Sequence, residues 1–111
     1  MPSRDDMMSA TVRVQDTLQT ALKTHAMEKQ TPLQQVYFQA VSAFLQRRLA
    51  EGAADYVNQP KGARMRTLWL PRKLLRNVRK IATQDRTTMA SFLYTALLSY
   101  ANAQGLTFNE T

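Results

Sequence analysis

The stretch Met65-Arg66-Thr67-Leu68-Trp69-Leu70-Pro71 decides how this chain folds. Its two leucines and its tryptophan favour an extended strand, and Pro71 begins a helix that is rich in arginine. A strand of about six residues is not stable alone, because even a two-stranded hairpin is marginal in water. The strand must therefore pair with another segment, and the face that it leaves exposed is available for function.

Composition limits the classes of protein to consider. The chain has 111 residues, which is enough for one domain, and 44% of them are hydrophobic, which is enough for a buried core. It has 15 Lys and Arg against 8 Asp and Glu, a formal net charge of +7. Such an excess predicts an anionic partner: nucleic acid first, and an acidic membrane surface second.

Several sites and segments are not predicted. The chain has no Cys, which excludes disulfides and thiolate metal sites, and it has a single His. It lacks a GxSxG motif, a glycine-rich phosphate loop and clustered carboxylates, so we expect no enzyme, catalytic residue, metal, cofactor or small-molecule substrate. The start of the chain has no apolar signal region, and no apolar run approaches the length of a membrane span. We therefore expect a cytoplasmic protein.

The first half of the chain predicts a strand and two helices. Residues 1–8 are polar with mixed charges, and we expect them to be flexible. Thr11–Gln15 alternates polar and apolar residues, as half-buried strands do. The helix that follows, capped by Asp16 or Thr17, has one apolar face. A second helix begins at Thr31-Pro32-Leu33-Gln34, with Thr31 as the predicted N-cap in a capping box, and runs to about residue 49.

The second half repeats this plan after a linker. Residues 51–63 contain two of the three glycines and predict the linker, with a helical turn around Ala53–Val57. A strand over Met65–Leu70 follows, then a helix over about Pro71–Gln84, then a helix from Thr87 or Thr88 to about residue 103.

The two halves align without a gap when one is shifted by 56 positions, the distance from Ala26 to Ala82. The same shift keeps the apolar stripes in register and pairs further identical residues: Thr11 with Thr67, Leu18 with Leu74, Thr31 with Thr87, and Ala40 with Ala96. We interpret this as an internal duplication of a strand-helix-helix unit over residues 9–50 and 64–105, followed by a tail at 106–111.

The repeated unit resembles the ribbon-helix-helix family of DNA-binding proteins, of the Arc and MetJ type. Residues 68–82, with Leu68-x-Leu70-Pro71 at the start, are similar to that family's strand-proline-helix signature, whereas the first copy has Gln15 where the proline would be. The resemblance covers residues 9–49 and 65–105. It implies a mostly helical fold in which two strands pair antiparallel and enter the major groove of double-stranded DNA. Because one chain holds both copies, it implies an intramolecular pseudo-dimer, similar to TraY-like plasmid proteins.

The alternation of side chains assigns the faces of the ribbon. Val12 and Val14 are expected to face the core, and the repeat places Leu68 and Leu70 with them. The other face is predicted to read bases, through Thr11, Arg13, Met65, Thr67 and Trp69. The guanidinium of an arginine can bond O6 and N7 of a guanine, whereas threonine and the apolar side chains suit thymine methyls. The two strands differ chemically, so an asymmetric site is expected.

Phosphate contacts are predicted at the start of each second helix and along the basic segments. Backbone N–H groups at a helix N-terminus attract anions. The predicted phosphate contacts are Thr31, Leu33, Arg66, Arg72, Lys73, Thr87, Thr88 and Met89. Because Pro32 removes one donor, the end at Thr88 and Met89 is expected to hold phosphate better. Alternatively, the basic residues are a solvated helix face, Arg13 is a plain surface charge, or Trp69 packs against a linker residue such as Tyr56.

The predicted function is repression of transcription by occupying an operator, with self-association on adjacent half-sites. The alternative is a relaxosome accessory protein that binds a plasmid transfer origin. An antitoxin is ranked lower because only residues 104–111 follow the last helix. The hypothesis that does not involve DNA is a basic helical protein that docks on a membrane or on another protein.

Overall fold

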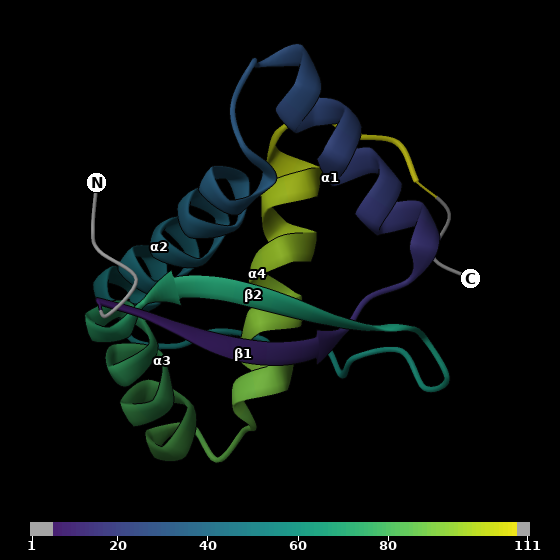
Figure 1. Cartoon of the computed structure of the whole chain (residues 1–111). Coiled ribbons are helices and arrows are strands. Elements are labelled where there is room, and N and C mark those ends of the chain that lie inside the picture. Colours follow the sequence, from purple (N-terminus) through teal and green to yellow (C-terminus); the bar gives the residue numbers. More distant parts are fainter. Residues whose placement is uncertain (1–5, 109–111) are drawn as a thin grey trace.

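The computed structural model describes residues 6–108. These residues form four helices and a two-stranded antiparallel sheet (Figure 1). In chain order the elements are β1 (Met7–Arg13), α1 (Asp16–Glu28), α2 (Leu33–Glu51), β2 (Met65–Pro71), α3 (Arg72–Gln84) and α4 (Met89–Ala103). The expected order of elements is therefore confirmed, including a linker between α2 and β2. None of these helices is both long and apolar enough to cross a lipid bilayer.

The two strands pair along their whole length. Thr11 lies opposite Thr67, with Met7 opposite Pro71 at one end and Arg13 opposite Met65 at the other. The expected bounds of the first strand, Thr11–Gln15, are wrong. The strand begins at Met7 and ends at Arg13, because its pairing with β2 extends back to Met7. Local alternation could not reveal this, since pairing with a distant strand stabilises residues whose own pattern is irregular. The expectation of a flexible start over residues 1–8 is wrong for Met7 and Met8, which pair with Pro71 and Leu70. Residues 1–5 lie outside the described residues.

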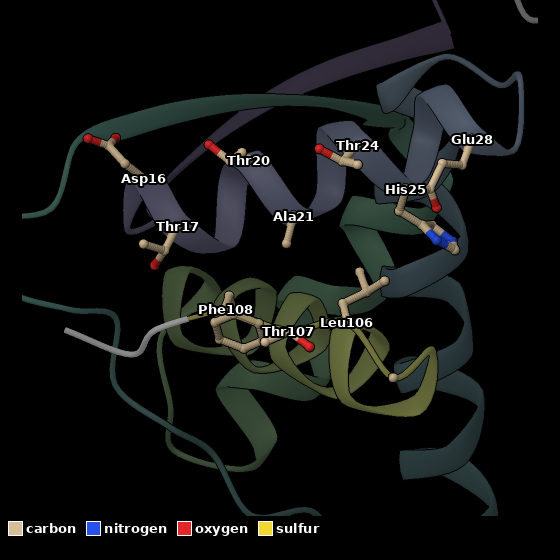
Figure 2. A pocket seen from close by; sticks show the side chains of 11 residues that line it. Asp16, Thr17, Thr20, Ala21, Thr24, His25, Glu28, Leu106, Thr107 and Phe108 are labelled. Carbon is tan, nitrogen blue, oxygen red and sulfur yellow. The ribbon is translucent and has the colours of Figure 1, made fainter.

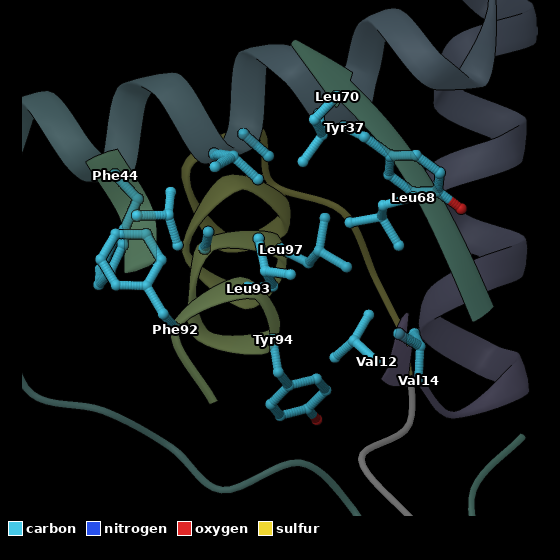
Figure 3. Packing of buried hydrophobic residues seen from close by; sticks show 14 of the residues in the cluster. Val12, Val14, Tyr37, Phe44, Leu68, Leu70, Phe92, Leu93, Tyr94 and Leu97 are labelled. Atoms are coloured by element: carbon cyan, nitrogen blue, oxygen red, sulfur yellow. The ribbon is translucent and has the colours of Figure 1, made fainter. Parts of the chain in front are cut away.

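The ribbon covers one side of α4 (Figure 1). Val12, Val14, Leu68 and Leu70 are fully buried, which confirms the predicted inner face. They point toward α4, whose residues from Ser91 to Leu97 are all buried (Figure 3). A helix that is apolar on nearly every side belongs at the centre of a fold, and α4 also packs against α1, α2 and α3.

The turn between helices has the same form in both halves. Gln30 and Arg86, which are 56 positions apart, are the two non-glycine residues with positive φ, at 55° and 58°, in the described chain. Each is followed by a threonine whose N–H bonds a carbonyl of the preceding helix: Thr31 to Ala26 at 3.0 Å, and Thr87 to Ala82 at 2.9 Å. α1 and α3 are both 13 residues long.

The helix starts differ from one expectation. Pro32 occupies the N-cap position of α2, and no side chain caps that helix, so the predicted cap at Thr31 is wrong. The N–H of Thr31 closes the preceding turn, which holds this residue in the connection rather than at the helix start. Thr88, in contrast, caps α4, because its side-chain oxygen accepts a hydrogen bond from the N–H of Ser91 at 3.0 Å.

The linker packs against α2 and α4. The predicted helical turn over Ala53–Val57 is absent, because residues 53–60 form neither a helix nor a strand. The Tyr56 ring lies 6.0 Å from Phe44 and 5.8 Å from Phe92, measured between ring centroids. The Val57 N–H bonds the Thr95 hydroxyl at 2.8 Å. These tertiary contacts hold the segment in place without a local helical turn.

A partly buried cluster joins the linker to both helix pairs. The Arg48 guanidinium, at the end of α2, donates two hydrogen bonds to Asp85, at 2.8 and 2.6 Å, and the Tyr56 hydroxyl donates to the same carboxylate. The hydrogen bonds from Arg48 and then Tyr56 lower the pKa of Asp85 to about 2. Burial, followed by the bond to Asp85, raises the pKa of Tyr56 to about 12. The carboxylate is thus charged and the phenol neutral over the physiological range.

Candidate nucleic-acid interface

The outer face of the ribbon is open to solvent. Ser9, Thr11, Met65, Thr67 and Trp69 are all exposed, with Met65 at 50% and Trp69 at 42%. The residues that alternate with them, including Val12, Leu68 and Leu70, are buried in the core. Because successive side chains of a strand point to opposite faces, the exposed side chains share one surface. Four predicted base-contacting residues therefore lie together, and Ser9 joins them. Their contact with DNA stays a prediction.

Arg13, the fifth predicted base contact, is partly buried and lies at one end of the ribbon. Its guanidinium Nη1 donates to the Ala63 carbonyl at 2.8 Å. Its backbone N–H donates to the side-chain oxygen of Gln59 at 2.7 Å. Arg13 is therefore oriented by the linker, and one of its donors is already in use, which distinguishes it from a free surface charge.

Trp69 lines a groove between the ribbon and the start of α2. The groove has a volume of about 370 Å³, and it is lined by Met7, Pro32, Gln34, Gln35, Phe38, Trp69 and Pro71. Leu33 and Gln34 also adjoin Met65 and Thr67 in a neighbouring hollow. Tyr56 packs against Phe44 and Phe92 instead of Trp69. The start of α2 and the outer face of β2 thus form one continuous surface.

Arg66 differs most from the role expected of it. It lies on the inner side of β2, partly buried, and its guanidinium forms an ion pair with Asp16 at the start of α1. Its Nε is buried without a hydrogen-bond partner among the described residues. Nearby, burial raises the pKa of Tyr37, whose hydroxyl donates to Gln19 at 3.0 Å. A phosphate contact by Arg66 requires competition with Asp16.

The other predicted phosphate contacts lie at the starts of α2, α3 and α4. Thr31 and Leu33, at the start of α2, are both half-buried. Arg72 and Lys73 are exposed in the first turn of α3. Thr88 is exposed and Thr87 half-buried, but the Thr88 side-chain oxygen already caps α4. Met89 borders a hollow with Met8, Arg72, Leu75, Arg76 and Arg79. The cations of α3 therefore stand beside the start of α4, while the stronger phosphate binding expected there stays a prediction.

A hollow of about 640 Å³ lies apart from the ribbon. It lies between α1 and residues Gly105–Phe108, and no residue of β1 or β2 lines it (Figure 2). His25, on its rim, is buried and bonds the Tyr100 hydroxyl through Nε2 at 2.9 Å. Within residues 6–108, no group of three or more His, Asp or Glu side chains is placed to hold a metal ion.

Sequence reasoning missed the contribution of the linker. Gln59 and Ala63 contact Arg13, and Arg64 extends the ladder, since its carbonyl accepts the N–H of Val14 at 3.1 Å. The Pro60-Lys61-Gly62 sequence signals a turn, but nothing in it says which strand the turn will contact.

Comparison with known proteins identified no relative of this chain: no family model, no curated protein and no solved structure matches it.

Proposed function

We propose that this protein binds double-stranded DNA in a sequence-dependent manner, by inserting its ribbon into the major groove. One observation carries the proposal: one face of the ribbon is buried in the core, and the other exposes a row of side chains, namely Ser9, Thr11, Met65, Thr67 and Trp69. A major groove about 12 Å wide admits a two-stranded ribbon, whose strands lie about 4.8 Å apart. The net charge of +7 favours a polyanion as the partner.

We further propose that the chain is a tandem pseudo-dimer. The register supports this, because the shift of 56 residues relates Thr11 to Thr67, and these two residues lie directly opposite each other. An antiparallel pair of equivalent strands has a two-fold axis at the point where equivalent residues meet. The matching helix hairpins, with positive φ at Gln30 and Arg86, are consistent with the same axis. β-ribbon proteins that read a major groove place such an axis on the DNA dyad.

The outer face supplies suitable chemistry for reading bases. The Thr11 and Thr67 hydroxyls can donate to or accept from base edges at the centre of the site. At one end of the ribbon, Arg13 and Met65 form a pair; at the other end, Ser9 and Trp69 do so. One end therefore suits guanine, and the other suits thymine methyls, which favours an asymmetric target.

Repression of transcription is the role that we propose for this binding, since a small protein on an operator blocks access to a promoter. The presence of two copies in one chain keeps the transfer-origin role as the alternative. Occupancy of a promoter in the cell, with release of transcription when the protein is removed, supports the first role. Stimulated nicking at a transfer origin by a relaxase supports the second.

The direct test selects bound duplexes from a random pool and measures affinity by fluorescence anisotropy. We expect Thr67→Ala to weaken binding to the selected duplex about fivefold or more and to change binding to random duplexes little. Thr20→Ala is the matched control, because Thr20 is exposed on α1 and lines the hollow that no residue of β1 or β2 borders. If no sequence is enriched, or if both variants bind like the parent protein, the ribbon is not the reading element.

A further inference from the structure

The linker is held in one position beside the ribbon. Gln59 and Ala63 bond Arg13 at 2.7 and 2.8 Å. Upstream, the hydroxyl of Thr95 on α4 bonds both the N–H and the carbonyl of Val57, at 2.8 and 3.2 Å. The linker is therefore anchored at α4 and again at the end of β1, with a short segment between the two anchors.

The segment nearest the ribbon is a tight turn. The N–H of Ala63 bonds the carbonyl of Pro60 at 3.3 Å, and Gly62 has a φ of 78°. A positive φ at the third position of a four-residue turn, after Pro in the first and Lys61 in the second, is typical of a type II turn. Lys61, Gly62 and Arg64 are exposed. Figure 1 shows this loop extending past the ends of both strands.

The two ends of the ribbon differ in their helical charges. At the Met7–Pro71 end, the chain enters α3 through Arg72 and Lys73, both exposed cations. At the opposite end, the positions related by the 56-residue shift are Asp16 and Thr17. Asp16 is anionic and forms an ion pair with Arg66. The first turn of α1 therefore offers an acidic side chain where the equivalent turn of α3 offers two cations.

The linker turn supplies positive charge at the end of the ribbon where α1 has none. Lys61 and Arg64 are exposed at the end of the ribbon where α1 offers no cation in its first turn. Arg64 is directly connected to the ladder, because its carbonyl accepts the Val14 N–H at 3.1 Å. Both charges are therefore carried on backbone whose position relative to the ribbon is set by hydrogen bonds.

We propose that the linker turn is a phosphate-binding element, in which Lys61 and Arg64 contact the DNA backbone beside the Arg13 end of the ribbon. This proposal rests on the proposed DNA binding. The turn replaces the cations that α1 lacks, and its Ala63 carbonyl orients Arg13 toward the adjacent groove. The linker then serves in recognition as well as in joining the two halves.

The test compares two double variants of equal charge. Lys61→Ala with Arg64→Ala removes two cations from the turn, whereas Lys23→Ala with Lys29→Ala removes two exposed cations from α1 and the residue after it. Each protein is titrated with the selected duplex over a range of salt concentrations. Each lost phosphate contact lowers the slope of log K against log salt by about 0.9. We expect the turn variant to lose a slope of about 2 and the control to lose less than half of that.

Hydroxyl-radical footprinting gives a second readout. We expect the turn variant to lose protection on one flank of the site only, since the cations of α3 remain at the other flank. A turn variant that keeps the slope and footprint of the control overturns this inference and leaves the proposed DNA binding intact. A parent protein that binds no duplex overturns both. If the alanine variant fails to fold, Lys61→Gln with Arg64→Gln keeps the side-chain length and replaces it.

Discussion

Replacing Asp85 by Asn tests the cluster that joins the linker to the helices. Asp85 accepts two hydrogen bonds from Arg48 and one from Tyr56, and the Arg48 and Asp85 side chains are only 9% and 15% exposed. Its pKa falls from an ordinary 3.8 to about 2. Since a tenfold change in an equilibrium constant is worth about 1.4 kcal/mol, the charged form contributes about 2 kcal/mol to the free energy of unfolding. Partial solvent exposure reduces this to about 1–2 kcal/mol.

The pH dependence of this contribution has a definite sign. A carboxyl whose pKa is lower in the folded state stabilises the fold above its unfolded pKa, and this stabilisation is lost as the pH falls through the folded value. We therefore expect Asp85→Asn to be less stable than the parent protein by about 1–2 kcal/mol at neutral pH. The difference should shrink between a pH of about 4 and a pH of about 2.

Urea unfolding followed by circular dichroism measures both quantities. Asp55→Asn is the control, because Asp55 is an exposed carboxylate of the same linker. The reasoning is refuted if the control loses as much stability as Asp85→Asn. It is also refuted if the stability difference for Asp85→Asn is the same at neutral and at strongly acidic pH.

Three further predictions concern single positions. Leu68→Ala, at a fully buried site beneath the ribbon, should lower the free energy of unfolding by about 2–5 kcal/mol in urea, whereas Trp69→Ala should mainly weaken DNA binding in anisotropy titrations. Tyr94→Phe leaves the side-chain oxygen of Gln15 without the donor that it has at 3.0 Å, and should cost about 1–3 kcal/mol by the same unfolding assay. Gly52→Ala should lower stability by about 1 kcal/mol in thermal unfolding, because its φ of 79° disfavours a side chain although no atom lies within 4 Å of the added carbon.

Sequence patterns predicted the structure best where a periodic pattern continues over many residues. The apolar stripes of the helices and the 56-residue shift predicted the order of elements and the buried faces of both strands, including Leu68 and Leu70. They were least reliable at the ends of elements. Thr31 has the residue type of a helix cap, but Pro32 holds that position, because the first helical N–H groups of α2 bond the Pro32 carbonyl.

The sequence predicted one part of the candidate interface, the exposed strand face, and missed another, the pairing of its cations. Alternation within the strands was sufficient to predict that Thr11, Met65, Thr67 and Trp69 share one exposed face. Charge alone, however, could not distinguish Arg66, which pairs with Asp16 on the inner side, from a cation that is open to solvent. An ion pair between residues 50 positions apart depends on how the chain folds, and composition carries no information about it.

The sequence by itself determined the repeated strand-helix-helix plan and which side of each strand is buried, because these follow from periodicities of 3.6 and 2 residues along the chain. Only the tertiary structure decided where the linker runs and what its residues contact. The linker has no period of its own, and its position is set by long-range bonds from Arg13 and Thr95. Those bonds bring Lys61 and Arg64 to the end of the ribbon where the adjoining helix begins with an acid.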